Sequence, residues 1–86
     1  MPKRRTVGTE NLIGQNMVLL RKQKKIRQTM LLSRIQVRGV DISQPMLSAI
    51  EGQKRKVTDR ELLAIADALG VSLEELFHPP GLEEEK

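Results

Sequence analysis

A short, mostly uncharged stretch that leads into three consecutive cations stands in the middle of this 86-residue chain. It reads DISQPMLSAIEGQKRK and spans residues 41–56. Ser43 is typical of a helix N-cap, Pro45 is tolerated in a first helical turn, and Gly52 is typical of a helix end. The pattern therefore predicts a short helix over about residues 43–51. Glutamine amides and serine hydroxyls can bind base edges, and lysine or arginine binds phosphate, so we expect recognition of a polyanion here.

Residue types that catalyse reactions or bind metals are scarce. The chain has no cysteine, no tyrosine, no tryptophan and one histidine, which excludes disulfides and thiolate metal sites. His78 lies beside two prolines, where we expect an ordinary surface residue, and no spacing of His, Asp or Glu resembles a metal site. We therefore expect no enzyme and no cofactor. Phe77 is the one aromatic residue, so single-strand stacking platforms are missing and a helix that reads duplex DNA remains.

The charges of the chain are distributed unevenly. Residues 1–60 carry fourteen Lys and Arg against four acids, a net +10, and residues 61–86 carry one lysine against seven acids, a net −6. A basic front favours a polyanion partner, although two solvated ends have the same composition. No apolar run approaches the roughly 18–20 residues of a membrane span, and no apolar stretch follows the basic start. We expect a cytoplasmic protein without a signal peptide or membrane segment.

Apolar residues at helical spacing predict five helices and no strand, which is an all-α fold. Thr9 is the expected N-cap of the first helix, with Glu10 in its first turn, and this helix runs to about residue 24. The second helix is expected over about residues 27–36. The third is the helix over about residues 43–51 described above.

Two capping boxes predict the starts of the last two helices. Thr58 and Glu61 have the T-x-x-E spacing ahead of an apolar run, and Ser72 and Glu75 repeat the spacing with serine. The fifth helix is expected to end near Phe77.

The expected domain organisation is simple. A flexible basic arm over residues 1–8 precedes one domain over residues 9–78, and an acidic tail over residues 79–86 follows it. The KRR run at residues 3–5 suits an arm that wraps DNA or enters its minor groove, and it equally suits a solubilising tail.

Four segments in this order and spacing resemble the phage repressor and Cro-like, XRE-type helix-turn-helix family. They are IGQNMVLLRKQKK, IRQTMLLSRI, ISQPMLSAIEGQKR and ELLAIADALGVSLEELF, and the resemblance covers about residues 12–77. It implies a compact five-helix, lambda-repressor-like DNA-binding domain in which helices two and three form the helix-turn-helix. It also implies a transcriptional regulator that binds duplex DNA, with the third helix in the major groove.

The resemblance assigns roles to individual residues. Gln28 stands where the family has a glutamine that commonly binds phosphate, and Gln44 matches a base-reading position. Arg21 and Glu51 match a family ion pair that ties the first helix to the end of the third. The expected DNA-binding residues are Arg27, Gln28, Arg38, Ser43, Gln44, Pro45, Met46, Ser48, Ala49, Gln53, Lys54, Arg55 and Lys56.

The chain departs from the family pattern in the turn and on the reading face. Residues 37–41 lengthen the turn between helices two and three, and Leu32 stands where a small residue is usual. Arg38 in that turn suits a phosphate contact and equally a solvated loop. Pro45 and Ala49 stand where relatives often carry polar readers, so readout is expected to lean on DNA shape as well.

Two functions fit the sequence. The first is a sequence-specific transcriptional regulator that binds as a homodimer, with Leu73, Leu76 and Phe77 as either dimer surface or core. The second is an antitoxin-like or adaptor module that uses the same fold to hold a protein partner. Its working surface would be the acidic second half of the chain.

Overall fold

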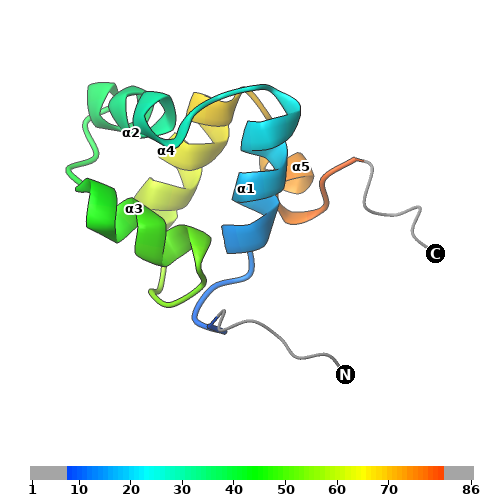
Figure 1. The fold of residues 1–86 in the computed structure, drawn as a ribbon, viewed down its shortest axis with the longest axis horizontal. Helices are drawn as coiled ribbons and strands as arrows, with labels where there is room; N and C mark the ends of the chain where they lie inside the picture. The colour runs from blue at the N-terminus through cyan, green and yellow to red at the C-terminus, as the bar shows by residue number, and fades with distance from the viewer. Residues whose placement is uncertain (1–7, 81–86) are drawn as a thin grey trace.

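The computed structural model describes residues 8–80, which form five α-helices and no strand (Figure 1). The helices are α1 (Gly14–Gln23), α2 (Gln28–Val37), α3 (Gln44–Glu51), α4 (Asp59–Leu69) and α5 (Leu73–Phe77). The predicted all-α fold is confirmed, and α2 and α3 form the predicted helix-turn-helix pair.

Side-chain caps begin the last three helices where the sequence predicts them. The hydroxyl of Ser43 accepts a backbone hydrogen bond at the start of α3. Thr58 Oγ1 accepts from the Glu61 amide at 3.1 Å, and Glu61 Oε1 accepts from the Thr58 amide at 3.0 Å. Ser72 and Glu75 make the same reciprocal pair at the start of α5. Each cap satisfies amides that have no acceptor within the helix.

The predicted start of the first helix is wrong. Thr9 is not its N-cap and Glu10 is not in its first turn, because α1 begins at Gly14. Asn11 Oδ1 accepts from the backbone amides of Ile13 and Gly14 at 3.0 and 2.8 Å. Asn11 therefore supplies the side-chain acceptor at the start of α1, two residues later in the chain than the predicted Thr9.

The segment before α1 runs beside the chain that leaves α3. The amide of Gly8 donates to the carbonyl of Gly52, and the amide of Glu10 donates to the carbonyl of Gln53, both at 2.8 Å. Gln53 Nε2 returns a hydrogen bond to the carbonyl of Asn11 at 2.8 Å. Because these hydrogen bonds hold the backbone of residues 8–10 against another segment, these residues do not extend α1.

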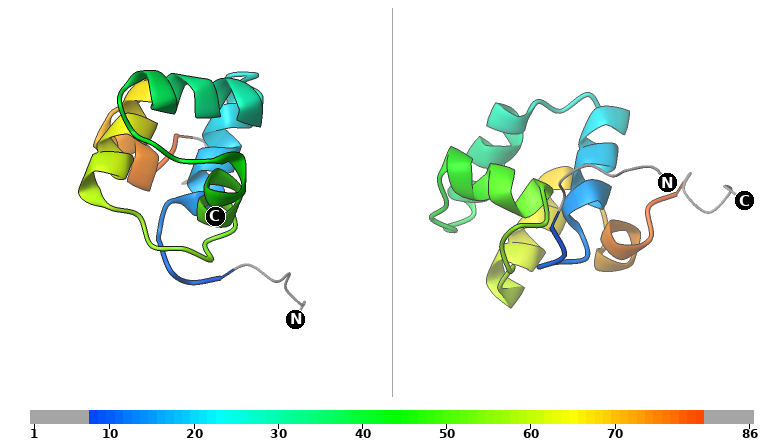
Figure 2. Two further views of the ribbon diagram at one scale, coloured as in Figure 1. Left: turned by 90° about the vertical axis from the view of Figure 1, so that its left-hand side faces the viewer. Right: turned by 60° about the horizontal axis from the view of Figure 1, so that its bottom comes forward.

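One hydrophobic core lies among the five helices, and α4 packs against both α2 and α5 (Figure 2). The buried core residues are Ile13, Met17, Leu20, Ile26, Leu31, Ile35, Ile42, Leu47, Ile50, Ala64, Ile65, Ala66, Ala68, Leu69 and Leu76. Full burial of each leucine or isoleucine contributes about 1.5–3 kcal/mol. Of the three C-terminal apolar residues, Leu76 is in the core, whereas Leu73 and Phe77 are exposed.

The lengthened turn between α2 and α3 is anchored rather than loose. It spans residues 38–43, and Gly39 takes a left-handed conformation with φ of 86°. Ile42 is buried in the core, and its carbonyl accepts from Gln36 Nε2 at 2.9 Å. The turn therefore delivers the chain to α3 in a defined position.

The packed part of the chain reaches slightly past the predicted boundary at residue 78. Pro79, the first residue of the expected acidic tail, is fully buried. Residues 1–7 of the predicted arm and 81–86 of the predicted tail lie outside the described residues. No helix in the described part of the chain has the length and apolar character needed to cross a bilayer.

Candidate nucleic-acid interface

The side-chain amide of Gln28 joins the start of α2 to the outer face of α3. Its Nε2 donates to Ser48 Oγ at 3.2 Å and to Glu51 Oε1 at 3.0 Å. Its Oε1 accepts from Gln44 Nε2 at 3.1 Å. Three residues predicted to bind DNA, from two helices, therefore lie in one hydrogen-bonded group.

An ion pair between Arg21 and Glu51 holds α3 against α1. Arg21 Nε lies 2.8 Å from Glu51 Oε2, and Nη2 lies 3.3 Å from Oε1. Arg21 Nη1 also donates to the carbonyl of Ile26 at 3.1 Å. The Glu51 side chain is only 8% exposed, and removing its charge partner would leave a buried carboxylate uncompensated. The structure thus brings together the two residues that the resemblance pairs.

The predicted contact residues on α3 differ in exposure. The exposed residues are Ser43, Gln44, Pro45 and Ser48. Ala49 is half-buried, and Met46 is half-buried against the core, with its sulfur 3.5 Å from the amide of Ser43. The outward polar surface of α3 is therefore carried by Gln44 and Ser48.

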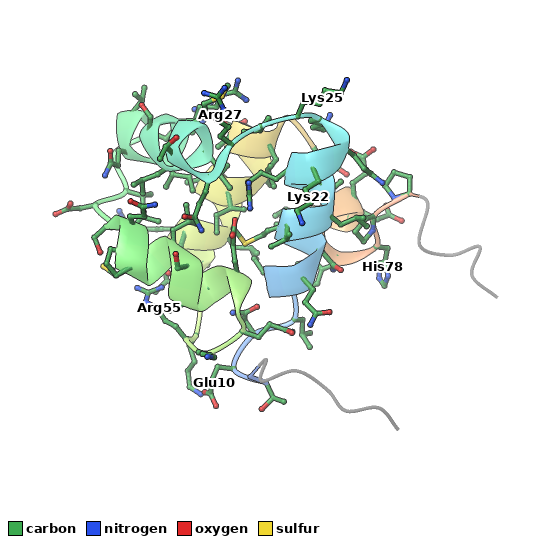
Figure 3. All side chains as sticks on the ribbon, in the orientation of Figure 1. Glu10, Lys22, Lys25, Arg27, Arg55 and His78 are labelled. Carbon is green, nitrogen blue, oxygen red and sulfur yellow. The ribbon has the colours of Figure 1, made fainter. Side chains whose placement is uncertain are left out.

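The three cations of the loop after α3, one of which is Arg55 (labelled in Figure 3), have different surroundings. Lys54 is exposed and has no side-chain partner among residues 8–80. Arg55 makes a bidentate pair with Glu61, with both N–O distances 2.9 Å. Lys56 Nζ lies 2.8 Å from Glu10 Oε1. Two of the three predicted phosphate-binding side chains thus already hold carboxylates of the same chain.

These pairs shift the ionisation of their members. The hydrogen bond from Arg55 holds the pKa of Glu61 below its ordinary value of 4.5, and Glu61 in turn raises the pKa of Arg55. The hydrogen bond between Lys56 and Glu10 lowers the pKa of Glu10 and raises that of Lys56. All four groups are therefore charged near neutral pH.

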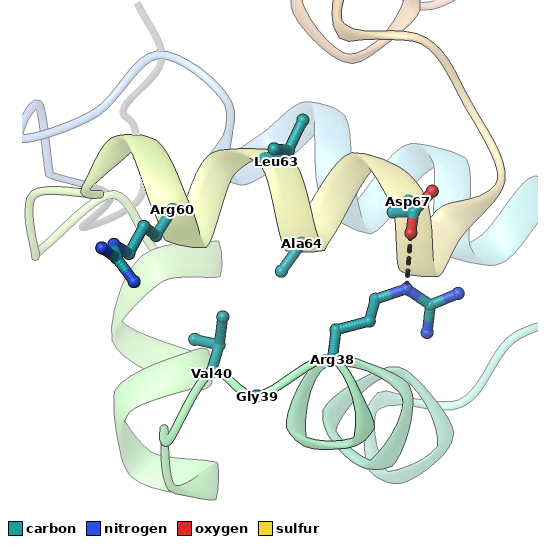
Figure 4. Close-up of a pocket in the computed structure, with 7 residues that line it drawn as sticks. All are labelled: Arg38, Gly39, Val40, Arg60, Leu63, Ala64 and Asp67. Atoms are coloured by element: carbon teal, nitrogen blue, oxygen red, sulfur yellow. Dashed lines mark hydrogen bonds and ion pairs between the residues drawn. The ribbon is translucent and has the colours of Figure 1, made fainter.

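Two further predicted contacts are engaged within the protein. Gln53 has a φ of 60°, and its side-chain amide donates a hydrogen bond to the carbonyl of Asn11. Arg38 Nε lies 2.8 Å from Asp67 Oδ2 on α4 (Figure 4), and Nη1 donates to a carbonyl of α2. In the structure Gln53 shapes the loop after α3, and Arg38 ties the lengthened turn to α4.

The start of α2 carries cations but no side-chain cap. Arg27 occupies the N-cap position without a capping hydrogen bond, and it lies with Lys25 at the same end of the molecule (Figure 3). Lys24 and Lys25 are exposed at this junction and were not among the predicted DNA-binding residues. Their position just before Gln28 in the sequence is the signal by which they could have been included as candidates.

A comparison with protein families identifies the family of this chain. A family model described as helix-turn-helix matches residues 19–76, from within α1 to the end of the core in α5. The chain belongs to the phage repressor and Cro-like helix-turn-helix family. This helix-turn-helix protein is thereby a DNA-binding protein, and its family is not one of enzymes. No curated protein and no solved structure matches the chain.

Proposed function

We propose that this protein is a sequence-specific transcriptional regulator that inserts α3 into the major groove of duplex DNA. The observation that carries the proposal is the hydrogen-bonded group of Gln28, Gln44 and Ser48 on the exposed side of α2 and α3. The major groove is about 12 Å wide and admits one helix, and its base edges offer the donors and acceptors that amides and hydroxyls match.

Gln44 is the main base-reading residue in this proposal. Its bond to Gln28 uses one amide hydrogen, which leaves the second hydrogen and the carbonyl oxygen for a base. A glutamine amide presenting both groups pairs with the N6 and N7 atoms of adenine. Ser48, one turn later on α3, adds a second polar contact. With so few readers, part of the specificity comes from the shape of the DNA.

Phosphate binding falls to groups that flank this reading surface. The uncapped first turn of α2 presents backbone amides, and Arg27 and Gln28 lie at the same point. Lys54 lies just beyond the C-terminal end of α3, and we propose it as the phosphate-binding cation there. Arg55 and Lys56 act less directly, because their bonds to Glu61 and Glu10 hold the loop that carries Lys54.

We further propose that the regulator acts as a homodimer in the cytoplasm. One short helix with two polar readers gives modest affinity, and paired half-sites about one helical turn apart multiply it.

The test is a titration with the protein's own upstream DNA and with a random duplex, at two salt concentrations. We expect tighter binding to the upstream DNA, weakening steeply with salt as phosphate counterions are released. Equal, salt-sensitive binding to both would support duplex binding and place the operator elsewhere. Failure to bind either duplex would contradict the proposal.

A pair of charge-reversal variants sharpens this test. Lys54→Glu should abolish duplex binding, whereas Arg60→Glu, the same charge change on the exposed side of α4, should leave most of it. Similar losses in both variants would mean that net charge alone drives binding.

A protein-binding module is the second candidate. The observation in its favour is that Arg55 and Lys56 are paired with carboxylates, which reduces the cationic surface around α3. If neither duplex binds, a pull-down with the intact chain is the next measurement.

A further inference from the structure

We infer that Glu51 is a positioning residue that decides which base Gln44 prefers, because it fixes the direction in which the amides of Gln28 and Gln44 face. Glu51 is buried, Gln28 is half-buried and Gln44 is exposed. A series of hydrogen bonds therefore runs from the interior to the outer face of α3. The inference rests on the proposed function, since it assigns Glu51 a part in base reading.

The direction of the Gln28 amide is set by its hydrogen-bond partners. The oxygen and nitrogen of a glutamine amide are alike in shape, but the oxygen only accepts and the nitrogen only donates. Ser48 does not set the direction, because a hydroxyl both donates and accepts, and Gln44 can offer either of its amide atoms. Of the three side chains that bond to Gln28, only the Glu51 carboxylate is restricted to accepting.

The restriction passes outward from α1 through three hydrogen bonds. The Arg21 guanidinium, which only donates, lies 2.8 Å from Glu51 Oε2 through its Nε. Glu51 Oε1 accepts from Gln28 Nε2 at 3.0 Å. Gln28 Oε1 is thereby turned toward Gln44, whose Nε2 donates to it at 3.1 Å. Each bond in this series determines the direction of the next amide.

The direction of the Gln44 amide discriminates between the two purines. Adenine and guanine both offer the N7 acceptor in the major groove, but adenine carries the N6 donor beside it and guanine carries the O6 acceptor. A Gln44 amide that donates to N7 through Nε2 places its Oε1 opposite that second position. It therefore accepts from adenine and repels guanine. The reversed amide places a donor there and loses this preference.

Glu51→Gln should reverse the whole series, because it keeps the shape of the side chain and adds a donor. Arg21 only donates, so the carbonyl of the substituted side chain faces Arg21 Nε and its NH2 group faces Gln28. Gln28 then turns its carbonyl toward residue 51 and its NH2 group toward Gln44. The Gln44 amide reverses in turn to accept this hydrogen bond.

Selection of bound duplexes from a randomised DNA pool, followed by sequencing, tests this reversal. The base pair read by Gln44 is the one at which Gln44→Ala abolishes the preference. Wild type should favour adenine over guanine there by roughly 5- to 150-fold, and Glu51→Gln should bring the ratio to about 1 or below. Arg21→Lys is the matched control. It weakens the ion pair but leaves the carboxylate in place, so it should keep the preference for adenine.

A rescue variant separates direction from stability. Gln28→Glu combined with Glu51→Gln places a carboxylate at residue 28, which accepts from both of its neighbours. Gln44 then donates again through Nε2, and the preference for adenine should return. Overall affinity should stay low, because the carboxylate at residue 28 repels the phosphate proposed to bind there. A purely structural role of Glu51 would not restore the base preference.

The direction of the Gln28 amide is also measurable in the wild-type chain without DNA. In a nuclear Overhauser spectrum of the 15N-labelled protein, its NH2 protons should show stronger contacts to Ser48 and Glu51 than to Gln44. This measurement decides the direction even where Glu51→Gln does not fold. Thermal melts followed by circular dichroism show which variants fold.

Two results would overturn the inference and leave the proposed function standing. One is a folded Glu51→Gln variant with the wild-type ratio of adenine to guanine, and the other is a Gln28 amide whose NH2 group faces Gln44. A wild-type chain that enriches no sequence from the pool would overturn the proposed function, and with it the role assigned to Glu51.

Discussion

Gln44 Nε2 on α3 lies 3.1 Å from Gln28 Oε1 on α2, so the first residues of the two helices share a hydrogen bond. The bond holds the Gln44 amide in one orientation before any ligand arrives. Ordering a long polar side chain costs up to about 1.5–2 kcal/mol of conformational free energy. In the proposed mode of binding, Gln28 therefore acts on base reading through the orientation of Gln44 as well as through any phosphate contact of its own.

The two glutamines are predicted to fail in different ways. Gln44→Ala should remove roughly 1–3 kcal/mol of binding to the preferred sequence and leave binding to a random duplex nearly unchanged. Gln28→Ala should weaken both, because it removes the phosphate contact proposed for this residue together with the orientation of Gln44. Fluorescence anisotropy with both duplexes measures the difference. An equal loss on both duplexes for Gln44→Ala would contradict its role as a reader.

The ion pair between Arg21 and Glu51 is predicted to be a major contributor to folding stability. Glu51→Ala should lower the free energy of unfolding by about 3 kcal/mol, near the lower end for breaking a buried pair, because it strands Arg21. Urea denaturation monitored by circular dichroism measures the change. Glu10→Ala is the matched control, since its pair with Lys56 lies on the exposed surface and its loss should change stability little. A comparable loss of stability in both variants would show that the pair of Arg21 and Glu51 contributes no more than an exposed ion pair.

A methyl group at residue 14 is predicted to destabilise the protein even though alanine favours helices. A Cβ on Gly14 would collide with the carbonyl oxygen of Ile50 and lie 2.7 Å from that of Glu51. We expect Gly14→Ala to lose about 1–3 kcal/mol through overpacking, against a gain of about 1 kcal/mol from helix propensity. Gly52→Ala serves as control, because the nearest atom would be 3.5 Å away and its φ is −84°. A stabilised Gly14→Ala variant would show that α1 can move away from α3.

The pair of Arg55 and Glu61 is predicted to make stability depend on pH on the acid side. The pKa of Glu61 is lowered in the folded state by the hydrogen bond from Arg55. Its contribution is therefore complete above the ordinary value of 4.5 and is lost as pH falls through the lowered folded pKa. Glu61→Gln should be less stable at pH 7, and its stability should fall less steeply below about pH 4.5.

Unfolding by urea at a series of pH values measures this slope. Glu75→Gln is the control, because Glu75 fills the same capping position on α5, is exposed and has no arginine bound to it among the described residues. Parallel slopes for wild type and Glu61→Gln would contradict the assignment.

The caps of the last three helices follow from the sequence because their causes are local. Ser43, Thr58 and Ser72 bond to amides three residues away, and apolar spacing of three and four residues marks the buried faces. Interactions of this range form within one helical turn, whatever the rest of the chain does. The resemblance to the helix-turn-helix family identified Gln28 and Gln44 as candidate DNA-binding residues.

The partners of the cations were decided only by the tertiary structure. Lys56 meets Glu10 across 46 positions and Arg38 meets Asp67 across 29, and no periodicity relates residues at such separations. The same packing set the start of α1, because residues 8–10 bond to the chain leaving α3 instead of extending the helix. A sequence shows which side chains carry charge. Whether a lysine faces a carboxylate or open solvent depends on which distant segments the core brings together, because a hydrogen bond forms only within about 3 Å and the attraction between exposed charges is largely screened beyond about 8–10 Å.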